Sequence, residues 1–351
     1  MKRGSGTTSP RASWLLETGG GKASTTRRRS PCRWLSWVQY SGKFFFLSIP
    51  QILSFLFLRK PSYQHYVNLF ILLLSSISLS LSLTLETRPN FVISTGDNFY
   101  PSGLKRVNDT LVKESFVDIY NYPSLNVPWY AVLGNHDYGD GSAKHDFSTK
   151  PAWQSTEWME KLDKRWICCG GRDFNTKKVT EDLDLFFLDT SPFVHEYYGE
   201  PWASVEGGIL DEKDKVQKQV ADLDLALERS IAKWKIVVGH HPVRSNGRHG
   251  DTAELVSVLP DILNKQNADF YLNGHEQDLQ DITEPTNKNL RYVTSGAGSK
   301  TRLESGMGHN KKNFFSITSG FVTVALSEKA ARVQFWYFDA TLAYQYVIER
   351  K

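Results

Sequence analysis

The chain has 351 residues, of which 40% are hydrophobic and 23% are charged, a composition typical of a globular protein with one large domain or two small ones. Its three cysteines, Cys32, Cys168 and Cys169, exclude a disulfide framework and a zinc finger or ribbon. The net charge of +4 conceals an asymmetry, because residues 1–96 contain 12 Lys and Arg against two acids, whereas the remainder is net acidic. The basic run at 27–29 lies in a Ser/Thr/Gly-rich tract typical of disorder, so we expect no nucleic-acid binding.

Residues 1–86 form an atypical region, basic and apolar, that we predict to be largely disordered. Within it, residues 67–85 are an uncharged run of 19 residues, close to the length of about 20 that spans a bilayer. A Leu-rich core followed by small polar residues is typical of a signal peptide, here preceded by residues foreign to the natural protein. A transmembrane anchor in contact with the membrane and a buried apolar segment are the alternatives.

A signal peptide at 67–85 would make the protein secreted or vacuolar. The sequence Asn108-Asp109-Thr110 is a glycosylation sequon, which fits a secreted glycoprotein. If the segment is instead a membrane anchor, the protein would be held at the membrane. The sequence does not indicate an oligomeric state.

From residue 87 to residue 351 the pattern is that of one folded domain. Five short apolar runs with strand character lie at 91–94, 129–133, 183–188, 235–238 and 269–272. The segment from Asp211 to Trp234 predicts a helix, whose apolar face would contain Val216, Val220, Leu223, Leu227 and Ile231. Strands that alternate with helices indicate a largely parallel or mixed sheet. Because 321–326, 331–337 and 342–349 suggest an antiparallel meander, we predict a two-sheet α/β sandwich.

Four of these apolar runs are followed by a glycine and then at once by a side chain that can bind a metal: Asp97, Asn135, His240 and His275. In an α/β sheet, loops beyond the carboxyl ends of the strands gather the ligands, so we expect these four side chains along one rim. Hydrolysis of a phosphate ester by two metals needs a bridging carboxylate, oxygen ligands and imidazoles. Tyr100 could add a phenolate, which favours trivalent iron.

The run from Phe91 to about Arg302 resembles the small, plant-type purple acid phosphatases, within the calcineurin-like metallophosphoesterases. The matching stretches are FVISTGDNFY, VLGNHDY, FFLDTSPFV, AKWKIVVGHHPVRSNGRHG, YLNGHE and TSGAGSK. The resemblance implies an αββα sandwich and an acid phosphatase that hydrolyses phosphomonoesters by attack of a metal-bound hydroxide. Its cofactors would be iron(III) beside a second divalent metal, which is iron, zinc or manganese.

The resemblance also implies roles for individual residues. The implied metal ligands are Asp97, Tyr100, Asn135, His240 and His275. Asp97 would bridge the metals and Tyr100 would bind iron, while the other three would bind the divalent metal. The implied catalytic residues, which contact phosphate and help to protonate the leaving group, are His136 and His249.

The sequence departs from the family pattern at two iron ligands. The first motif, DxG, is absent because no aspartate precedes Asp97, and the last motif ends in Gln277 in place of a histidine. We therefore predict that the fold lacks its first strand and helix, leaving neighbouring strands with unpaired backbone groups. An impaired pseudo-phosphatase or truncated gene product that retains only the divalent site is the alternative function, and a one-metal phosphodiesterase is a third.

Three further polar residues near the motifs are expected to be local in their effect. We expect His241 only to follow His240, Asp137 to shape its loop, and Asp189 to cap the next turn.

Overall fold

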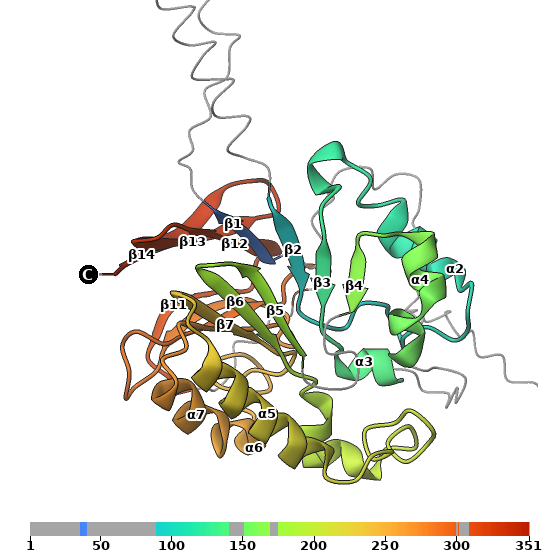
Figure 1. The fold of residues 1–351 in the computed structure, drawn as a ribbon. Coiled ribbons are helices and arrows are strands. Elements are labelled where there is room, and N and C mark those ends of the chain that lie inside the picture. Colours follow the sequence, from blue (N-terminus) through green and yellow to red (C-terminus); the bar gives the residue numbers. More distant parts are fainter. Residues whose placement is uncertain are drawn as a thin grey trace, which may run out of the picture.

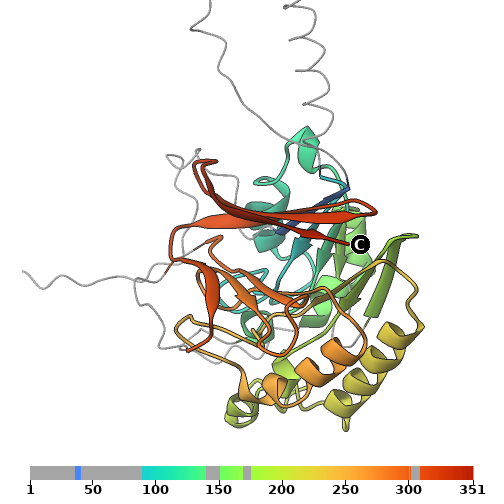
Figure 2. The same ribbon diagram turned by 90° about the vertical axis from the view of Figure 1, so that its left-hand side faces the viewer.

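The structure, a computed structural model, describes residues 36–40, 89–139, 151–168, 175–299, 301 and 309–350, with the backbone alone for 36–40 and 151–152. These residues form two stacked mixed sheets with helices on both outer faces (Figures 1 and 2). The predicted αββα sandwich is therefore confirmed. The signal-like segment 67–85 lies outside the described residues. Within the described part of the chain, no helix has the length and apolar character needed to cross a membrane.

The first sheet joins the C-terminal meander to the strands that follow the N-terminal region. Its seven strands lie in the order β14 (Leu342–Glu349), β13 (Ala330–Tyr337), β12 (Gly320–Leu326), β1 (Ser36–Tyr40), β2 (Phe91–Ser94), β3 (Trp129–Ala131) and β4 (Trp166–Cys168). The meander β12–β14 is antiparallel, as predicted, whereas β2, β3 and β4 are parallel to one another.

Strand β1 corrects the prediction that the first strand of this sheet is missing. It pairs in parallel with β12 and antiparallel with β2, so the position between them is filled within a region expected to be disordered. Because β1 runs antiparallel to β2, the carboxyl ends of the two strands lie at opposite ends of the sheet, and β1 does not lead to the loop that follows β2. The strand therefore closes the gap in the backbone hydrogen bonding without replacing the DxG motif.

The second sheet contains the strands that precede the two histidine-bearing loops. Its seven strands lie in the order β11 (Lys312–Ser316), β9 (Leu279–Thr283), β10 (Arg291–Ser295), β8 (Phe270–Asn273), β7 (Trp234–Val238), β6 (Leu183–Phe187) and β5 (Asn175–Thr180). Strands β6, β7, β8 and β10 are parallel, and the edges are antiparallel.

Helices cover the outer face of each sheet (Figure 1). They are α2 (Thr110–Val112), which continues as a π-helical turn at Lys113–Val117, α3 (Asn135–Tyr138), α4 (Glu157–Leu162), α5 (Lys215–Arg229), α6 (Ala253–Val256) and α7 (Leu259–Lys265). The prediction of a helix from Asp211 to Trp234 was too long at both ends. Ile231, placed on its apolar face, follows the helix and is 87% exposed.

Three apolar clusters hold the layers together. One lies between the sheets and includes alternate residues of β7, Trp234, Ile236 and Val238, whereas Val237 points to the cluster beneath α5 and α7. A third packs Trp129 and other residues of β2–β4 against α2 and α4. The central strands β2, β3, β7 and β8 thus bury both faces, which explains their nearly continuous apolar runs in the sequence.

Candidate metal centre

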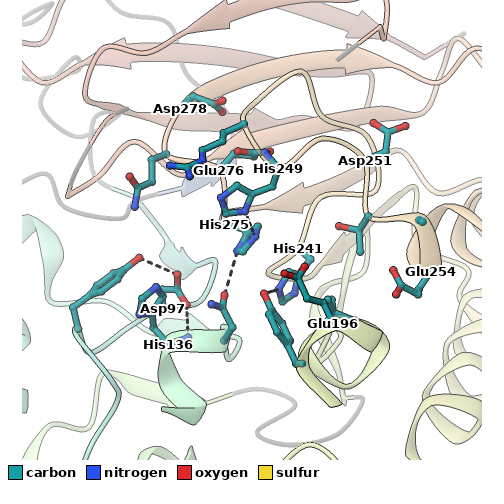
Figure 3. Close-up of a pocket in the computed structure, with 18 residues that line it drawn as sticks. Asp97, His136, Glu196, His241, His249, Asp251, Glu254, His275, Glu276 and Asp278 are labelled. Carbon is teal, nitrogen blue, oxygen red and sulfur yellow. Dashed lines mark hydrogen bonds between the residues drawn. The ribbon is translucent and has the colours of Figure 1, made fainter. Parts of the chain in front are cut away.

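The four predicted loops meet at one edge of the sandwich. Asp97 and Asn135 follow β2 and β3 of the first sheet, and His240 and His275 follow β7 and β8 of the second. Because β2 and β3 are parallel, and β7 and β8 are parallel, each pair of loops leaves its sheet on the same side. The loops line a pocket of about 710 Å³, shown in Figure 3.

Four donor atoms converge at the floor of this pocket. Asn135 Oδ1 lies 3.1 Å from His240 Nε2 and 3.2 Å from His275 Nδ1, and these two nitrogens are 3.2 Å apart. Asp97 Oδ1 lies 3.3 Å from His240 Nε2. A tetrahedral ion with bonds of about 2.1 Å separates its ligand atoms by about 3.4 Å, so this spacing fits one metal ion.

The carboxylate of Asp97 is held ionised although it is buried. Burial alone would raise its pKa, but His240 and His136 outweigh that effect and hold the pKa of Asp97 well below its usual range. The backbone N–H of His136 donates to Asp97 Oδ1 at 3.0 Å, and the hydroxyl of Tyr100 donates to Asp97 Oδ2 at 2.9 Å. Each carboxylate oxygen therefore has its own hydrogen-bond donor, which fixes the orientation of the Asp97 side chain.

Two glycines let the loops approach each other closely. Gly96 has φ +94°, and a Cβ atom there would lie 2.5 Å from His240 Nδ1. A Cβ atom at Gly134 would collide with Asp97 Oδ1 and lie 2.7 Å from His240 Cε1. Glycine is thus required at both positions by the close approach of the loops, and at Gly96 by the turn as well.

The two predicted catalytic histidines lie on opposite sides of the donor cluster. His249 Nδ1 is 2.6 Å from His275 Nε2, and the two rings meet edge to face. His136 Nδ1 is 2.7 Å from the carbonyl oxygen of Pro101, and its ring packs against Tyr100 with centroids 4.5 Å apart. Both histidines line the pocket, and both are labelled in Figure 3.

His241 does more than follow His240, which corrects our expectation. His240, His241 and His275 form a group whose potential ligand atoms lie within 4.8 Å of one another. Both ring nitrogens of His241 have partners, however: Nδ1 is 2.9 Å from Thr190 Oγ1 and Nε2 is 3.0 Å from the Tyr197 hydroxyl. Burial, together with the charge of His240, holds the pKa of His241 well below its usual value. His241 is therefore a neutral, hydrogen-bonded part of the pocket wall.

Thr190 supports the histidine loop from below. Its hydroxyl oxygen accepts the backbone N–H groups of His240 at 3.1 Å and of His241 at 3.0 Å. Since these two bonds occupy both lone pairs of the oxygen, the hydroxyl must donate its proton to His241 Nδ1, and His241 Nε2–H then donates to Tyr197. Sequence reasoning missed both Thr190 and His241; the Gly-His-His run and the threonine directly after Asp189 were the available signals.

Two buried carboxylates fix the loops around the site. Asp137 accepts the backbone N–H of Gly134 at 2.9 Å and of Asn98 at 3.0 Å, so it shapes its loop as expected and ties it to the loop of Asp97. Burial and the nearby charge of Asp97 raise the pKa of Asp137 to about 6. Asp189 accepts the N–H of Ser191 at 3.3 Å, the predicted cap.

The cap is the smaller part of what Asp189 does. Its carboxylate also forms a buried ion pair with Lys215 of α5, with Nζ 3.1 Å from Oδ2. The Tyr138 hydroxyl of α3 donates to the same oxygen. Asp189 therefore joins a helix of the first layer to a helix of the second beside the site.

The part of the pocket expected to bind iron has fewer donors. Tyr100 and Asp97 Oδ2 are present, and Gln277 lines the pocket where the family pattern has a histidine. Gln277 offers only a neutral amide, which is a poor ligand for a hard trivalent ion. The described residues thus supply a full donor set for one metal and an incomplete set for the second.

The sequence matches the family model for calcineurin-like phosphoesterases over residues 74–278. The chain therefore belongs to the calcineurin-like phosphoesterase family. Within this family it is similar to purple acid phosphatases. Purple acid phosphatase 17 of Arabidopsis thaliana is 37% identical over 273 residues, which is 75% of each chain.

Purple acid phosphatase 3 of the same plant is 41% identical over 253 residues, or 70% of this chain and 65% of that relative. The matched region thus spans slightly less than two thirds of that relative's length. Among solved structures, the Plasmodium protein described as "GAP50 the anchor in the inner membrane complex" has a TM-score of 0.57 at 24% identity. The likeness covers 75% of this chain and 79% of that one, and it concerns the fold alone.

Proposed function

We propose that this protein is an acid phosphatase that hydrolyses phosphomonoesters at a metal centre held by Asp97, Asn135, His240 and His275. The observation that carries the proposal is the convergence of four donor atoms at spacings of 3.1 to 3.3 Å. A carboxylate, an amide oxygen and two imidazoles suit zinc, manganese or ferrous iron. Bound there, the metal would supply a Lewis acid and an activated water.

The hydrogen bonds around His275 determine which protons the pocket presents. Because burial and the neighbouring histidines hold the pKa of His275 well below its usual value, its ring is neutral and carries one proton. If Nδ1 keeps a lone pair for the metal, the proton is on Nε2, and Nε2–H donates to His249 Nδ1. A neutral His249 then carries its own proton on Nε2. That N–H is the group we assign to donate a hydrogen bond to the leaving oxygen and so stabilise the charge that develops on it.

In His136 the Nδ1 atom is a hydrogen-bond donor, whereas in His249 it is an acceptor. Pro101 offers only a carbonyl oxygen, so His136 Nδ1 must carry a proton and donate it. Nε2 is therefore the ring nitrogen of His136 that remains for contact with a bound phosphate. The backbone N–H of the same residue holds Asp97, so binding of phosphate and orientation of the carboxylate share one residue.

The side wall of the pocket is lined by charged side chains. Glu196, Asp251 and Glu254 line it, with Arg248 as a cationic neighbour, and Figure 3 shows the three acids across the pocket from Asp97. Carboxylates on this wall repel an anionic phosphate, so they oppose its binding there and leave the side of the pocket that carries the metal ligands.

An iron(III) ion does not fit the second half of the centre, and no step of the proposal passes through it. Tyr100, one oxygen of Asp97 and the amide of Gln277 are too few and too weakly charged for a hard trivalent ion. This favours, as the second candidate, an impaired phosphatase that retains the divalent site alone. A one-metal phosphodiesterase would use the same four ligands.

Secretion and glycosylation remain part of the proposal. The Asn108 side chain is exposed directly before α2, where the Asp109 carboxylate accepts the N–H of Leu111 at 3.0 Å as the helix cap. The sequon is therefore accessible to a glycosyltransferase. Peptide mapping of protein secreted from plant cells would test both, because intracellular retention or an unmodified Asn108 contradicts them.

The first experiment is elemental analysis of protein expressed with iron, zinc and manganese, followed by p-nitrophenyl phosphate hydrolysis. We expect one divalent metal per chain, activity with a maximum at acid pH, and loss of both in His240→Ala. The matched control is His195→Ala, which removes an exposed histidine that is not one of the four ligands. One bound metal without hydrolysis would refute the phosphatase and leave the second candidate. Preference for a diester substrate would favour the phosphodiesterase.

A further inference from the structure

Glu276 is a buried acid that the proposed chemistry does not use. Its side chain lines the back of the pocket but is only 2% exposed. A single carboxylate oxygen, Oε1, accepts the hydroxyl of Ser245 at 2.8 Å and the backbone N–H groups of His249 at 2.9 Å and Gly250 at 3.1 Å. All three donors lie on the loop 244–251, so the charge of Glu276 is directed at this loop.

The same loop depends on side chains for its shape. It contains no helix or strand, and within the described part of the chain other side chains also hold its backbone. The N–H of Ser245 donates to Asp251 Oδ1 at 2.8 Å, and the N–H of Asn246 donates to Gln280 Oε1 at 2.7 Å. Of these anchors, Glu276 is the one that binds the backbone of His249 directly.

Two consecutive residues, His275 and Glu276, therefore hold the ring and the backbone of His249. The ring of His249 meets His275 through Nδ1, and its backbone N–H is bound by Glu276. His275 has a left-handed backbone, with φ 60°, which turns these two neighbouring side chains toward the same loop from different directions. A Cβ atom at Gly247 would collide with the Glu276 carboxylate, so the loop is packed directly against this acid.

We propose that Glu276 is a positioning residue that fixes His249 against His275, and thereby sets the direction in which the His249 N–H points into the pocket. The inference rests on the proposed phosphatase function for its catalytic consequence. Its structural content, the placement of the His249 ring, does not depend on catalysis. Outer residues that orient a catalytic or metal-bound histidine commonly change activity or metal affinity by about 10- to 100-fold when removed.

The catalytic test is a double-mutant cycle. We expect Glu276→Ala to lower kcat for p-nitrophenyl phosphate by about 10-fold or more, with KM and zinc content nearly unchanged. In the His249→Ala background, Glu276→Ala should have almost no further effect, because its action passes through His249. Independent, multiplicative losses in the two variants would overturn the proposal.

The structural test uses ¹⁵N-histidine NMR of the zinc-loaded protein. Glu276→Ala should shift the ring resonances of His249 and His275, and Glu276→Gln, which keeps an acceptor oxygen, should shift them less and remain folded if the alanine variant does not. The matched control, Asp269→Asn, alters a buried carboxylate just before β8, the strand that leads to His275. It should leave both resonances in place.

Unmoved resonances in folded Glu276 variants would overturn the proposal. If the wild-type protein shows no hydrolysis, the phosphatase function fails, and the resonance shifts alone then decide whether Glu276 positions His249.

Discussion

Replacing Thr190 by valine tests the support beneath the histidine loop. Valine keeps the branched shape but removes the oxygen that accepts the backbone N–H groups of His240 and His241. Thr190 is fully buried, so both donors would be left without an acceptor and without water. Each unsatisfied buried group costs about 1–3 kcal/mol, so we expect Thr190→Val to lower the free energy of unfolding by about 2–6 kcal/mol.

Thr190→Ser is the matched control. It keeps the hydroxyl and removes one methyl group, at a cost of about 1 kcal/mol. Urea unfolding of the metal-free proteins, with equal m-values, would give the two free energies. The difference between them isolates the hydroxyl. If the valine variant is as stable as the serine variant, the assigned hydrogen bonds do not support this loop.

Two further substitutions test buried charges. Burial and the charge of Glu276 raise the pKa of Asp278 to about 8. Between about pH 4 and pH 8 the folded state therefore holds a proton that the unfolded state has lost. The free energy of unfolding falls as the pH rises through that window. Asp278→Asn should therefore be more stable than the wild type at pH 7, by at most about 4 kcal/mol, and as stable as the wild type near pH 4. A difference in free energy of unfolding that does not vary with pH would contradict this. Lys215→Met leaves Asp189 as a buried, unpaired carboxylate, so it should lower the free energy of unfolding by about 3–5 kcal/mol in chemical denaturation. The exposed control, Lys213→Met, should lower it by less than about 0.5 kcal/mol. Equal losses in the two lysine variants would refute the stabilising role of the pair.

Three strands that lead to the ligand-bearing loops, and that the sequence predicts well, share one physical property. Strands β2, β7 and β8 are buried on both faces, so each has a continuous apolar run closed by a polar loop, and the predicted limits lie within one residue of the observed ones. Strand β9 was missed because two of its five residues, Gln280 and Asp281, are polar but fully buried. Their side chains are satisfied by partners distant in the chain, such as the guanidinium of Arg291, which local composition does not indicate.

The site residues also divide into those that the local sequence reveals and those that only contacts between distant segments reveal. The residues after the glycine turns could be found from the sequence, because the loop chemistry is local, and the structure brings Asp97, Asn135, His240 and His275 to one point. The roles of Thr190 and Glu276 could not be found in this way. Each acts through hydrogen bonds to a loop 26 to 51 residues away in the sequence, and these contacts exist only once neighbouring strands of the second sheet have paired.

The donor atoms come equally from the two sheets, which has a mechanical consequence. Two of them belong to one sheet of the sandwich and two to the other, so an ion bound among them would link the two sheets directly. Any sliding of one sheet past the other would separate the donors by the same amount and weaken their hold. Slow sliding motions of the whole sandwich should therefore be damped when the ion is present, and an assay of metal retention would report on the rigidity of regions far from the pocket.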